Sequence, residues 1–426
     1  MRAKKYILSL ATVYMCYFTH GIQAIILSQN AIYFYEKWGY TDPSAGAAAV
    51  SLAITATGLG KFLTVWIGGE ISDKVGRKKM AVLGAILYTL CFLGLLLTTN
   101  MMVAAVCAFI AGVATSGFWD ASLYPAAQES APKFAASAMV GIKFFVSLSG
   151  VIYPLLVVNF IKTGSQSIGI IIPLVLSIIC TVLAAIAPFA YDDMMKEKTS
   201  VNGQEKNAVQ EEIDAAKAKM LVKPNVAVNF LTMFYGFLCM FIMYGAQQYT
   251  KAFGLTNAGL TEMQSAGLTS IYTFGSIIAV LFWAMMMGKL RWNPLKVLFI
   301  DAVFISIALA LVLLVQHVVV IYISIAFLGF FAAGGALQTG LGVRQMFCPG
   351  PKGRNTGIYY TWMGLASTFL PYIVASMTKS VGETQAIFIM MGLLLTAGVL
   401  SIFMMVYLLG QHKKVFGYSA FERVKD

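Results

Sequence analysis

The stretch Gly69-Glu70-Ile71-Ser72-Asp73-Lys74-Val75-Gly76-Arg77-Lys78-Lys79 is a short, highly charged island between two long apolar runs. If both runs cross a membrane, one helix must end here, the chain must turn within a few residues, and the next helix must enter the bilayer. Gly69 and Gly76 are expected to supply the backbone freedom for that turn. The basic residues are typical of a loop on the cytoplasmic side. The island therefore predicts a tight cytoplasmic connection between two spanning helices.

The composition of the whole chain is that of a membrane protein with many spans. Of its 426 residues, 59% are hydrophobic and only 11% are charged, and the mean hydropathy is +0.78. A soluble domain has a charged share of about 25%, and a spanning helix needs about 20 mainly apolar residues. The sequence predicts an all-α membrane protein with twelve transmembrane helices, at 6–28, 46–68, 79–98, 101–126, 137–160, 167–190, 224–248, 264–287, 295–315, 318–340, 355–378 and 383–409.

The positions of the basic residues predict the orientation of these helices. Of the 30 lysines and arginines, 24 fall on the cytoplasmic side, four fall on the opposite side of the membrane, and two fall inside predicted spans. This asymmetry places both termini in the cytoplasm. The first apolar run is too long for a secretory signal and is interpreted as a retained helix. The basic residues of the cytoplasmic loops then account for the net charge of +12, so no nucleic-acid partner is expected.

The pattern G-x-x-x-D-K-x-G-R-K-K in the island resembles the loop between the second and third helices of the major facilitator superfamily. The resemblance implies two pseudo-symmetric six-helix bundles, and a secondary active transporter that works by alternating access around a cavity between them. It also implies a conformational motif made of Gly69, Asp73, Gly76 and Arg77, in which Asp73 acts as a latch. The expected location is a bacterial cytoplasmic (inner) membrane, and the expected working unit is a monomer.

The chain is expected to have an N-terminal bundle at 1–190, a cytoplasmic linker at 191–223, and a C-terminal bundle at 224–426 with a cytoplasmic tail. The linker is the one long polar segment, so a solvated connector is expected, with partner binding as the alternative. The two bundles are weakly alike in sequence. Gly112 and the residues after it can be laid over Gly329 and its successors at an offset of 217, as expected for a repeated bundle.

Few ionisable residues fall inside the predicted spans, and such residues by default face a cavity or one another. Lys61, Asp120 and Lys143 all fall on the cytoplasmic half of their helices. They could form a buried ion-pair set that orders the N-terminal bundle. Alternatively, a lysine could anchor an anionic substrate while Asp120 binds and releases a proton. Asp301 is expected near the start of its helix, as a local cap or an interface charge.

Polar side chains in both bundles suit a small hydrogen-bonding ligand. His20 near the middle of the first helix is either a packing residue or a group that contacts substrate or carries a proton. The polar residues of the second bundle could instead serve interhelical packing. The predicted substrate-binding residues are His20, Gln23, Lys61, Lys143, Tyr244, Gln247, Gln338 and Tyr360, and the predicted proton-coupling residues are Asp120 and His20.

An enzymatic function is not expected. The chain has only three histidines, and it lacks a zinc-protease pattern, a nucleotide-binding loop and a serine–histidine–aspartate order. Five of the six cysteines fall in predicted spans, so neither a disulfide framework nor a metal site is indicated. No catalytic residue, cofactor or metal is therefore predicted. The expected partners are a small-molecule substrate, protons and the lipid bilayer.

The phrases Tyr-Phe-Thr-His-Gly-Ile (17–22), Asp-Ala-Ser-Leu-Tyr-Pro (120–125) and Ala-Ala-Gly-Gly-Ala-Leu-Gln (332–338) resemble those of bacterial inner-membrane transporters of the YdiM and YdiN type. By the gene setting of those proteins, the resemblance implies a hydroxylated cyclic carboxylate such as shikimate or quinate. The prediction is proton-coupled symport of a small organic anion. Two alternatives stay open: a drug/proton antiporter that exports amphiphilic compounds, which the 23 methionines favour, and a transporter-like ligand sensor that signals through the linker.

Overall fold

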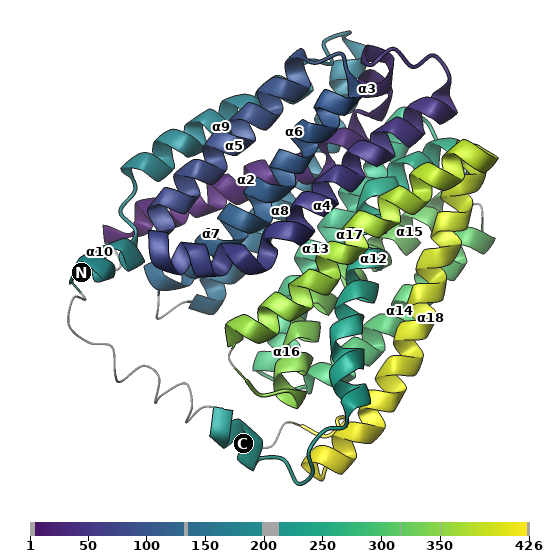
Figure 1. The fold of residues 1–426 in the computed structure, drawn as a ribbon. Coiled ribbons are helices and arrows are strands. Elements are labelled where there is room, and N and C mark those ends of the chain that lie inside the picture. Colours follow the sequence, from purple (N-terminus) through teal and green to yellow (C-terminus); the bar gives the residue numbers. More distant parts are fainter. Residues whose placement is uncertain (1–4, 132–134, 198–212, 316, 351, 424–426) are drawn as a thin grey trace.

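A computed structural model describes residues 5–131, 135–197, 213–315, 317–350 and 352–423, and all regular secondary structure in these ranges is helical. Lys133 and residues 198–212 of the expected linker lie outside the described residues. The helices form two sets that stand side by side (Figure 1).

The N-terminal helices are α2 (Ile7–Gln29), α4 (Pro43–Val75), α5 (Arg77–Leu97), α6 (Met101–Val113), α7 (Ala121–Ser130), α8 (Ala135–Lys162) and α9 (Ile168–Ile186), with the π-helical segment η1 (Ala114–Asp120) between α6 and α7. The C-terminal helices are α12 (Val226–Thr256), α13 (Glu262–Gly288), α14 (Pro294–Leu314), α15 (Val318–Leu328), α16 (Leu337–Phe347), α17 (Lys352–Val381) and α18 (Glu383–Phe416), with the π-helical segment η3 (Gly329–Ala336) between α15 and α16. The short helices α3 (Ala31–Lys37) and α10 (Ala190–Glu197) follow α2 and α9.

The predicted all-α membrane fold is confirmed. In the described part, eleven helical stretches are long and apolar enough to cross a membrane, and each coincides with a predicted run. Large apolar side chains lie on the outside, among them Trp66, Leu97 and Phe403, which are at least 60% exposed. Such a surface suits lipid and not water.

The remaining predicted run, 355–378, corresponds to α17. This helix has 30 residues, so at 1.5 Å per residue it is about 45 Å long and exceeds the bilayer core. Helix α17 is not among the eleven apolar stretches because its tyrosines, serines and threonines lower its mean hydropathy. The helix packs along α4, which supports a position inside the assembly. The count of twelve spanning helices stays a prediction.

The turn after α4 is shorter than the sequence suggested, and the prediction that Gly69 supplies backbone freedom for this turn is wrong. Helix α4 continues through Gly69 to Val75, and of the two glycines only Gly76 has a positive φ, of 98°. Backbone hydrogen bonding in α4 continues past Gly69, so the turn is confined to one residue. The carboxylate of Asp192 on α10 then accepts hydrogen bonds from the backbone N–H groups of Arg77 and Lys78, where the start of a helix favours negative charge.

In Figure 1 the N-terminal end of the described chain lies beside α10 and the C-terminal end lies below α16, both at the end of the molecule away from α3. We call this end the linker side, and the opposite end, which holds α3, the far side. The arrangement agrees with both termini on one face of a membrane. Which face is cytoplasmic stays a prediction from the positive charges.

The internal repeat has a structural counterpart. Segment η1 begins two residues after Gly112, and η3 begins at Gly329, which are the glycines that the offset brings together. A π-helix is rare and frequently marks a functional site. Its occurrence at the equivalent point of both helix sets supports the duplication and identifies the region where the long helices depart from regular geometry.

Helices α4 and α17 join the two sets through a contact between their backbones. A Cβ atom on Gly58 would lie 2.3 Å from the carbonyl oxygen of Ser367, and one on Gly364 would lie 2.8 Å from the Cα atom of Phe62. Small residues allow this approach in membrane helices, where close packing drives association. Helix α8 packs against α13 across the molecule, where Gly150 faces the side chain of Thr273.

Hydrogen bonds between described residues connect the two sets on the far side. Gln248 donates to the carbonyl of Ala24 at 2.6 Å, and Ser270 donates to the carbonyl of Val151 at 2.8 Å. Lys251 of α12 donates to the carbonyl of Gln29, the last residue of α2, at 2.8 Å. The far side is therefore closed in this conformation.

Lys251 is the charged member of this closure. It is only 5% exposed, and its ammonium lies 3.2 Å from Glu262 of its own helix set. The cation faces the carbonyl end of α2, where the helix dipole is negative. Glu262 provides the opposite charge that a buried lysine needs.

We expect Lys251→Gln to open the far side. The change removes a charge-assisted hydrogen bond worth about 1.5–3 kcal/mol, which shifts the ratio of open to closed molecules by about tenfold or more. Spin labels at positions 162 and 263, at far-side ends of α8 and α13, should report longer distances by pulsed electron resonance.

Lys379→Gln is the matched control, because Lys379 is an exposed far-side lysine in the last turn of α17. It should leave the distance distribution unchanged. An identical distribution in Lys251→Gln and the parent protein would contradict the closing role of Lys251.

Candidate functional site

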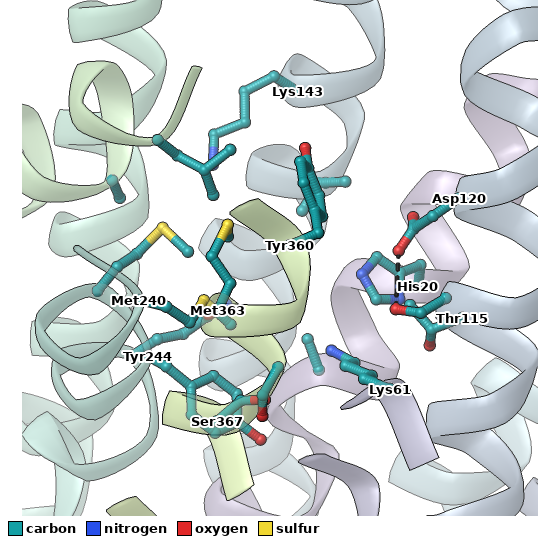
Figure 2. A pocket seen from close by; sticks show the side chains of 18 of the residues that line it. His20, Lys61, Thr115, Asp120, Lys143, Met240, Tyr244, Tyr360, Met363 and Ser367 are labelled. Carbon is teal, nitrogen blue, oxygen red and sulfur yellow. Dashed lines mark hydrogen bonds between the residues drawn. The ribbon is translucent and has the colours of Figure 1, made fainter. Parts of the chain in front are cut away.

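A cavity of about 160 Å³ lies between the two helix sets. Eight of the nine predicted substrate-binding and proton-coupling residues line it: His20, Lys61, Asp120 and Lys143 from the N-terminal helices, and Tyr244, Gln247, Gln338 and Tyr360 from the C-terminal helices. Figure 2 shows His20, Asp120 and Lys61 on one side of the space and Met240 and Tyr244 on the other. Residues from distant parts of the chain thus converge on one site.

His20 is oriented by a hydrogen-bond network behind the cavity wall. Its Nδ1 atom lies 2.8 Å from the hydroxyl of Tyr88 on α5. The same hydroxyl lies 2.6 Å from the hydroxyl of Thr115 and donates to the side chain of Gln23 at 3.4 Å. Gln23 is buried and is the one predicted binding residue outside the cavity lining. The structure therefore places Gln23 as a support for Tyr88.

Asp120 is the acidic residue of the cavity lining, at the last position of η1. The hydroxyl of Tyr17 donates to one carboxylate oxygen at 3.0 Å, and the hydroxyl of Ser116 donates to the other at 3.2 Å. These two hydroxyl groups come from different helices, so they restrict the rotation of the carboxylate. Asp120 thereby presents a fixed acidic group to the cavity.

The two lysines of the cavity have different surroundings. The ammonium of Lys61 lies 6.0 Å from the centre of the Tyr244 ring, at the limit of a cation–π contact, and Asp120 is the acidic group that attracts it. Lys143 has no carboxylate partner among the described residues. Figure 2 shows Lys61 and Lys143 on different sides of Tyr360. None of the described ion pairs joins Lys61, Asp120 and Lys143, which argues against the structural ion-pair interpretation.

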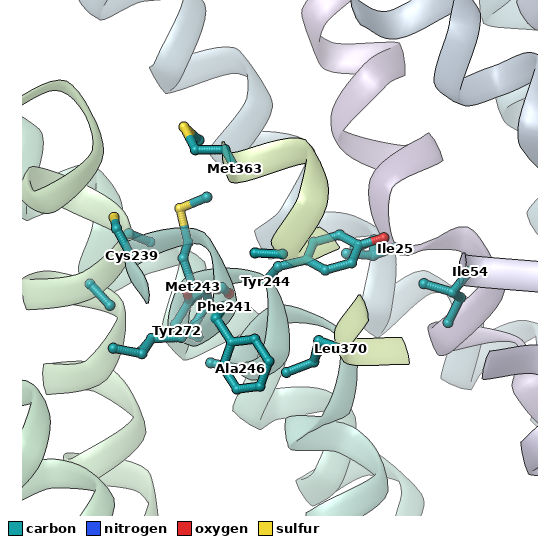
Figure 3. Packing of buried hydrophobic residues seen from close by; sticks show 14 of the residues in the cluster. Ile25, Ile54, Cys239, Phe241, Met243, Tyr244, Ala246, Tyr272, Met363 and Leu370 are labelled. Atoms are coloured by element: carbon teal, nitrogen blue, oxygen red, sulfur yellow. Dashed lines mark hydrogen bonds between the residues drawn. The ribbon is translucent and has the colours of Figure 1, made fainter. Parts of the chain in front are cut away.

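The C-terminal helices give the cavity an apolar wall. Met240, Met243 and Met363 line it together with the ring of Tyr272. Figure 3 shows Met243 and Met363 in the packed cluster around Tyr244. Methionine and tyrosine supply adaptable and amphipathic contact surface. The cavity thus combines a polar, charged side with an apolar side.

Sequence reasoning missed several of these residues. Tyr88 carried a usable signal, because it is a hydroxyl-bearing side chain in the middle of a predicted apolar span. Thr115, Ser116, Met240 and Met363 carried none, since the spacing of residues along one helix does not identify the face that meets a second bundle.

The motif residues form a separate network on the linker side. Arg77 is almost fully buried and bonds Asp73 and Ser72, each at 2.7 Å, and Glu129 of α7 at 3.3 Å. Asp73 is mostly exposed, and in this conformation its side chain pairs with Arg77 of its own helix set. Its action as a latch stays a prediction.

Asp301 does not reach the cavity, and its expected capping role is wrong because Asn293 caps the start of α14.

Comparison with known proteins supports the fold and the sequence resemblance. The sequence profile of the Major Facilitator Superfamily matches residues 13–344. The inner membrane transport protein YdiN of Escherichia coli (strain K12) is 28% identical over 376 residues, which cover 88% of this chain and 84% of YdiN. The MFS-type transporter YfkL of Bacillus subtilis (strain 168) is 31% identical over 371 residues, covering 87% of this chain and 89% of YfkL.

Among solved structures, the crystal structure of a D-xylose-proton symporter superposes with a TM-score of 0.71 at 14% identity, covering 94% of this chain and 97% of the symporter. At this identity the similarity establishes the fold alone. The predicted resemblance to transporters of the YdiN type is confirmed at the level of sequence.

We expect Tyr88→Phe to destabilise the protein. Loss of the hydroxyl leaves His20, Thr115 and Gln23 without a shared buried partner, which costs about 1–3 kcal/mol. The midpoint of thermal unfolding in detergent should fall by several degrees. Tyr372→Phe is the control, since Tyr372 is 54% exposed on α17; equal midpoints for both variants would contradict the network.

Proposed function

Because this chain belongs to the major facilitator superfamily and is an inner-membrane transporter, we propose that it carries a small organic anion together with protons. In this proposal, bundles at 1–190 and 224–426 rock about the cavity, and the 191–223 linker connects them. A hydroxylated cyclic carboxylate such as shikimate or quinate is the candidate substrate, and uptake is the direction proposed. Membership of a superfamily does not identify a substrate, so the proposal rests on the residues that line the cavity.

The excess of positive charge in the cavity is the observation that carries the proposal. Lys61 and Lys143 line it, whereas Asp120 is the single acidic residue among the described lining residues. A cation inside a membrane is costly unless an opposite charge reaches it. A carboxylate substrate would supply the partner that Lys143 lacks. The hydroxyls and amides of Tyr360, Gln247 and Gln338 could bind the hydroxyl groups of such a substrate.

The size of the cavity favours a small ligand. Its volume of about 160 Å³ is below the roughly 300–1,000 Å³ of pockets that enclose drug-sized molecules. Gln338 is exposed on α16, whereas Tyr244 is buried, so the lining extends from the interior toward an accessible edge. With the far side closed by Lys251, this geometry suits a substrate that exchanges from the linker side.

Asp120 is the residue proposed to couple protons. As a carboxylate it attracts Lys61, and on protonation this attraction disappears. Lys61 is then available to a substrate anion, so proton binding and anion binding favour each other. The hydroxyls of Tyr17 and Ser116 hold Asp120 in place while its proton moves between the carboxylate oxygen and cavity water. His20 is a second candidate in this relay.

A drug/proton antiporter is the second candidate function, and a specific feature favours it. The apolar wall with Met240, Met243 and Met363 could accept amphiphilic molecules. A cationic drug would need Asp120 as its recognition charge and would be repelled by both lysines. The charges therefore favour the anion, and the following transport experiments separate the two candidates.

We expect proteoliposomes with the wild-type protein to accumulate labelled shikimate, quinate or another small carboxylate when the proton gradient points inward. Asp120→Asn should keep exchange of that acid across the membrane and lose gradient-driven accumulation, because an amide cannot release a proton. Glu36→Gln, which changes an exposed carboxyl on α3, is the control. Undiminished accumulation by Asp120→Asn would exclude its coupling role, and binding of lipophilic cations without uptake of any acid would favour the antiporter.

Lys143→Gln should weaken binding of the carboxylate by about tenfold to a hundredfold, the cost of losing a hydrogen bond to a charged group. Binding of the methyl ester of the same acid should change little. Lys61→Gln measured in parallel shows which lysine contacts the carboxylate. Equal losses for acid and ester would indicate that Lys143 maintains the structure instead of binding the substrate.

A further inference from the structure

Asp301 is a buried carboxyl group outside the cavity. It lies on α14, seven residues after the first residue of the helix, and its exposure is 0%. Neither of its carboxyl oxygens has a hydrogen-bond partner among the described residues. Native proteins rarely leave a buried polar group unpaired, and such a group calls for an explanation.

Gly335 of η3 lies between Asp301 and Trp283 of α13. A Cβ atom on Gly335 of η3 would lie 3.2 Å from Oδ2 of Asp301 and 2.7 Å from the indole nitrogen of Trp283. That indole nitrogen is also buried without a partner. The absence of a side chain at Gly335 therefore leaves room for the carboxyl group and the indole on the same side of η3.

No cation compensates the carboxyl group. Asp301 belongs to none of the ion pairs in the described residues. The titratable groups that interact with it electrostatically are Tyr235 and Cys239 of α12, and neither carries positive charge. The described helices α16 and α18, which pack against α14, carry the buried titratable groups Arg344 and His412, and neither forms a described ion pair or hydrogen bond with Asp301. An isolated carboxylate in such a site would cost many kcal/mol, so the group is expected to hold its proton.

Segment η3 lies between Asp301 and the substrate cavity. Ala333 of η3 lines the cavity, whereas Gly335, two residues later, faces Asp301. The next helix, α16, carries the cavity residues Leu337 and Gln338. A shift of this π-helical segment that accompanies substrate binding would also change the contact of Asp301.

We propose that Asp301 is a second proton-binding site of this carrier, loaded in the conformation described and emptied when η3 moves. In the release step, the O–H bond of the carboxylic acid breaks, the proton passes to water that reaches the group when η3 moves, and the carboxylate remains. The proposal rests on the proposed proton coupling, but it assigns a group in the C-terminal helices, separate from Asp120. Coupling would then involve one carboxyl group in each helix set.

Infrared spectroscopy of the purified full-length protein in lipid tests this assignment without any substrate. The wild type should show the carbonyl band of a protonated, weakly hydrogen-bonded carboxyl group near neutral pH. Asp301→Asn should lack this band, and Asp120→Asn should retain it. Asp301→Glu should restore a band at a shifted frequency, which keeps the test valid if the Asn variant folds poorly.

Identical carbonyl bands in the wild type and Asp301→Asn would overturn the proposal, whatever the transport experiments show. The release step has its own test in Lys251→Gln, with the population of the opened far side measured by spin labels. The band should be weaker in that variant at the same pH. An undiminished band in a sample with an opened far side would exclude release through movement of η3. Failure of carboxylate uptake with these band changes present would count against the proposed substrate alone.

Discussion

Gly58 of α4 faces the carbonyl oxygen of Ser367 on α17 at a distance that leaves no space for a Cβ atom. This contact brings the two helix sets together, and the position of the cavity follows from it. Lys61 follows Gly58 by three residues on α4, and Ser367 and Gly364 of α17 are themselves part of the cavity lining. The helices that bring the two sets together are therefore also helices that line the cavity, one with a lysine and the other with polar groups. A larger side chain at Gly58 would separate the walls as well as the helices.

The division of chemistry between the two helix sets follows from the cost of charge in a membrane. His20, Lys61, Asp120 and Lys143 all come from the N-terminal helices, and the methionines come from the C-terminal helices. A ligand in the cavity meets charge on one side and polarizable apolar surface on the other. A buried carboxyl group of the C-terminal helices, Asp301, is set apart behind η3 and forms no ion pair with a described cation. Each set thus holds one carboxyl group near a π-helical segment.

The spanning helices and most of the cavity residues could be predicted from sequence because few polar side chains occur inside long apolar runs. Lys61, Asp120 and Lys143 were evident for this reason. Gln23 lies outside the cavity lining, because its side chain accepts a hydrogen bond from Tyr88 of another helix. This contact between helices could not be predicted from the sequence. The π-helical segments left no trace in hydrophobic periodicity, because they alter the backbone over only seven or eight residues. Gly69 looked like a turn residue from its charged neighbours, yet α4 continues past it.

The unpaired lysine of the cavity has a consequence for energetics across a polarised membrane. With Asp120 ionised, the described lining of the empty cavity holds two ammonium groups and one carboxylate, a net charge of +1. In the proposed symport, the loaded form carries a proton on Asp120 and a monoanion beside the lysines, so its net charge is also +1. Each elementary charge that crosses the full field gains or loses about 2.3 kcal/mol per 100 mV. The membrane voltage thus acts in opposite directions on the loaded crossing and on the unloaded return, and one complete cycle moves no net charge.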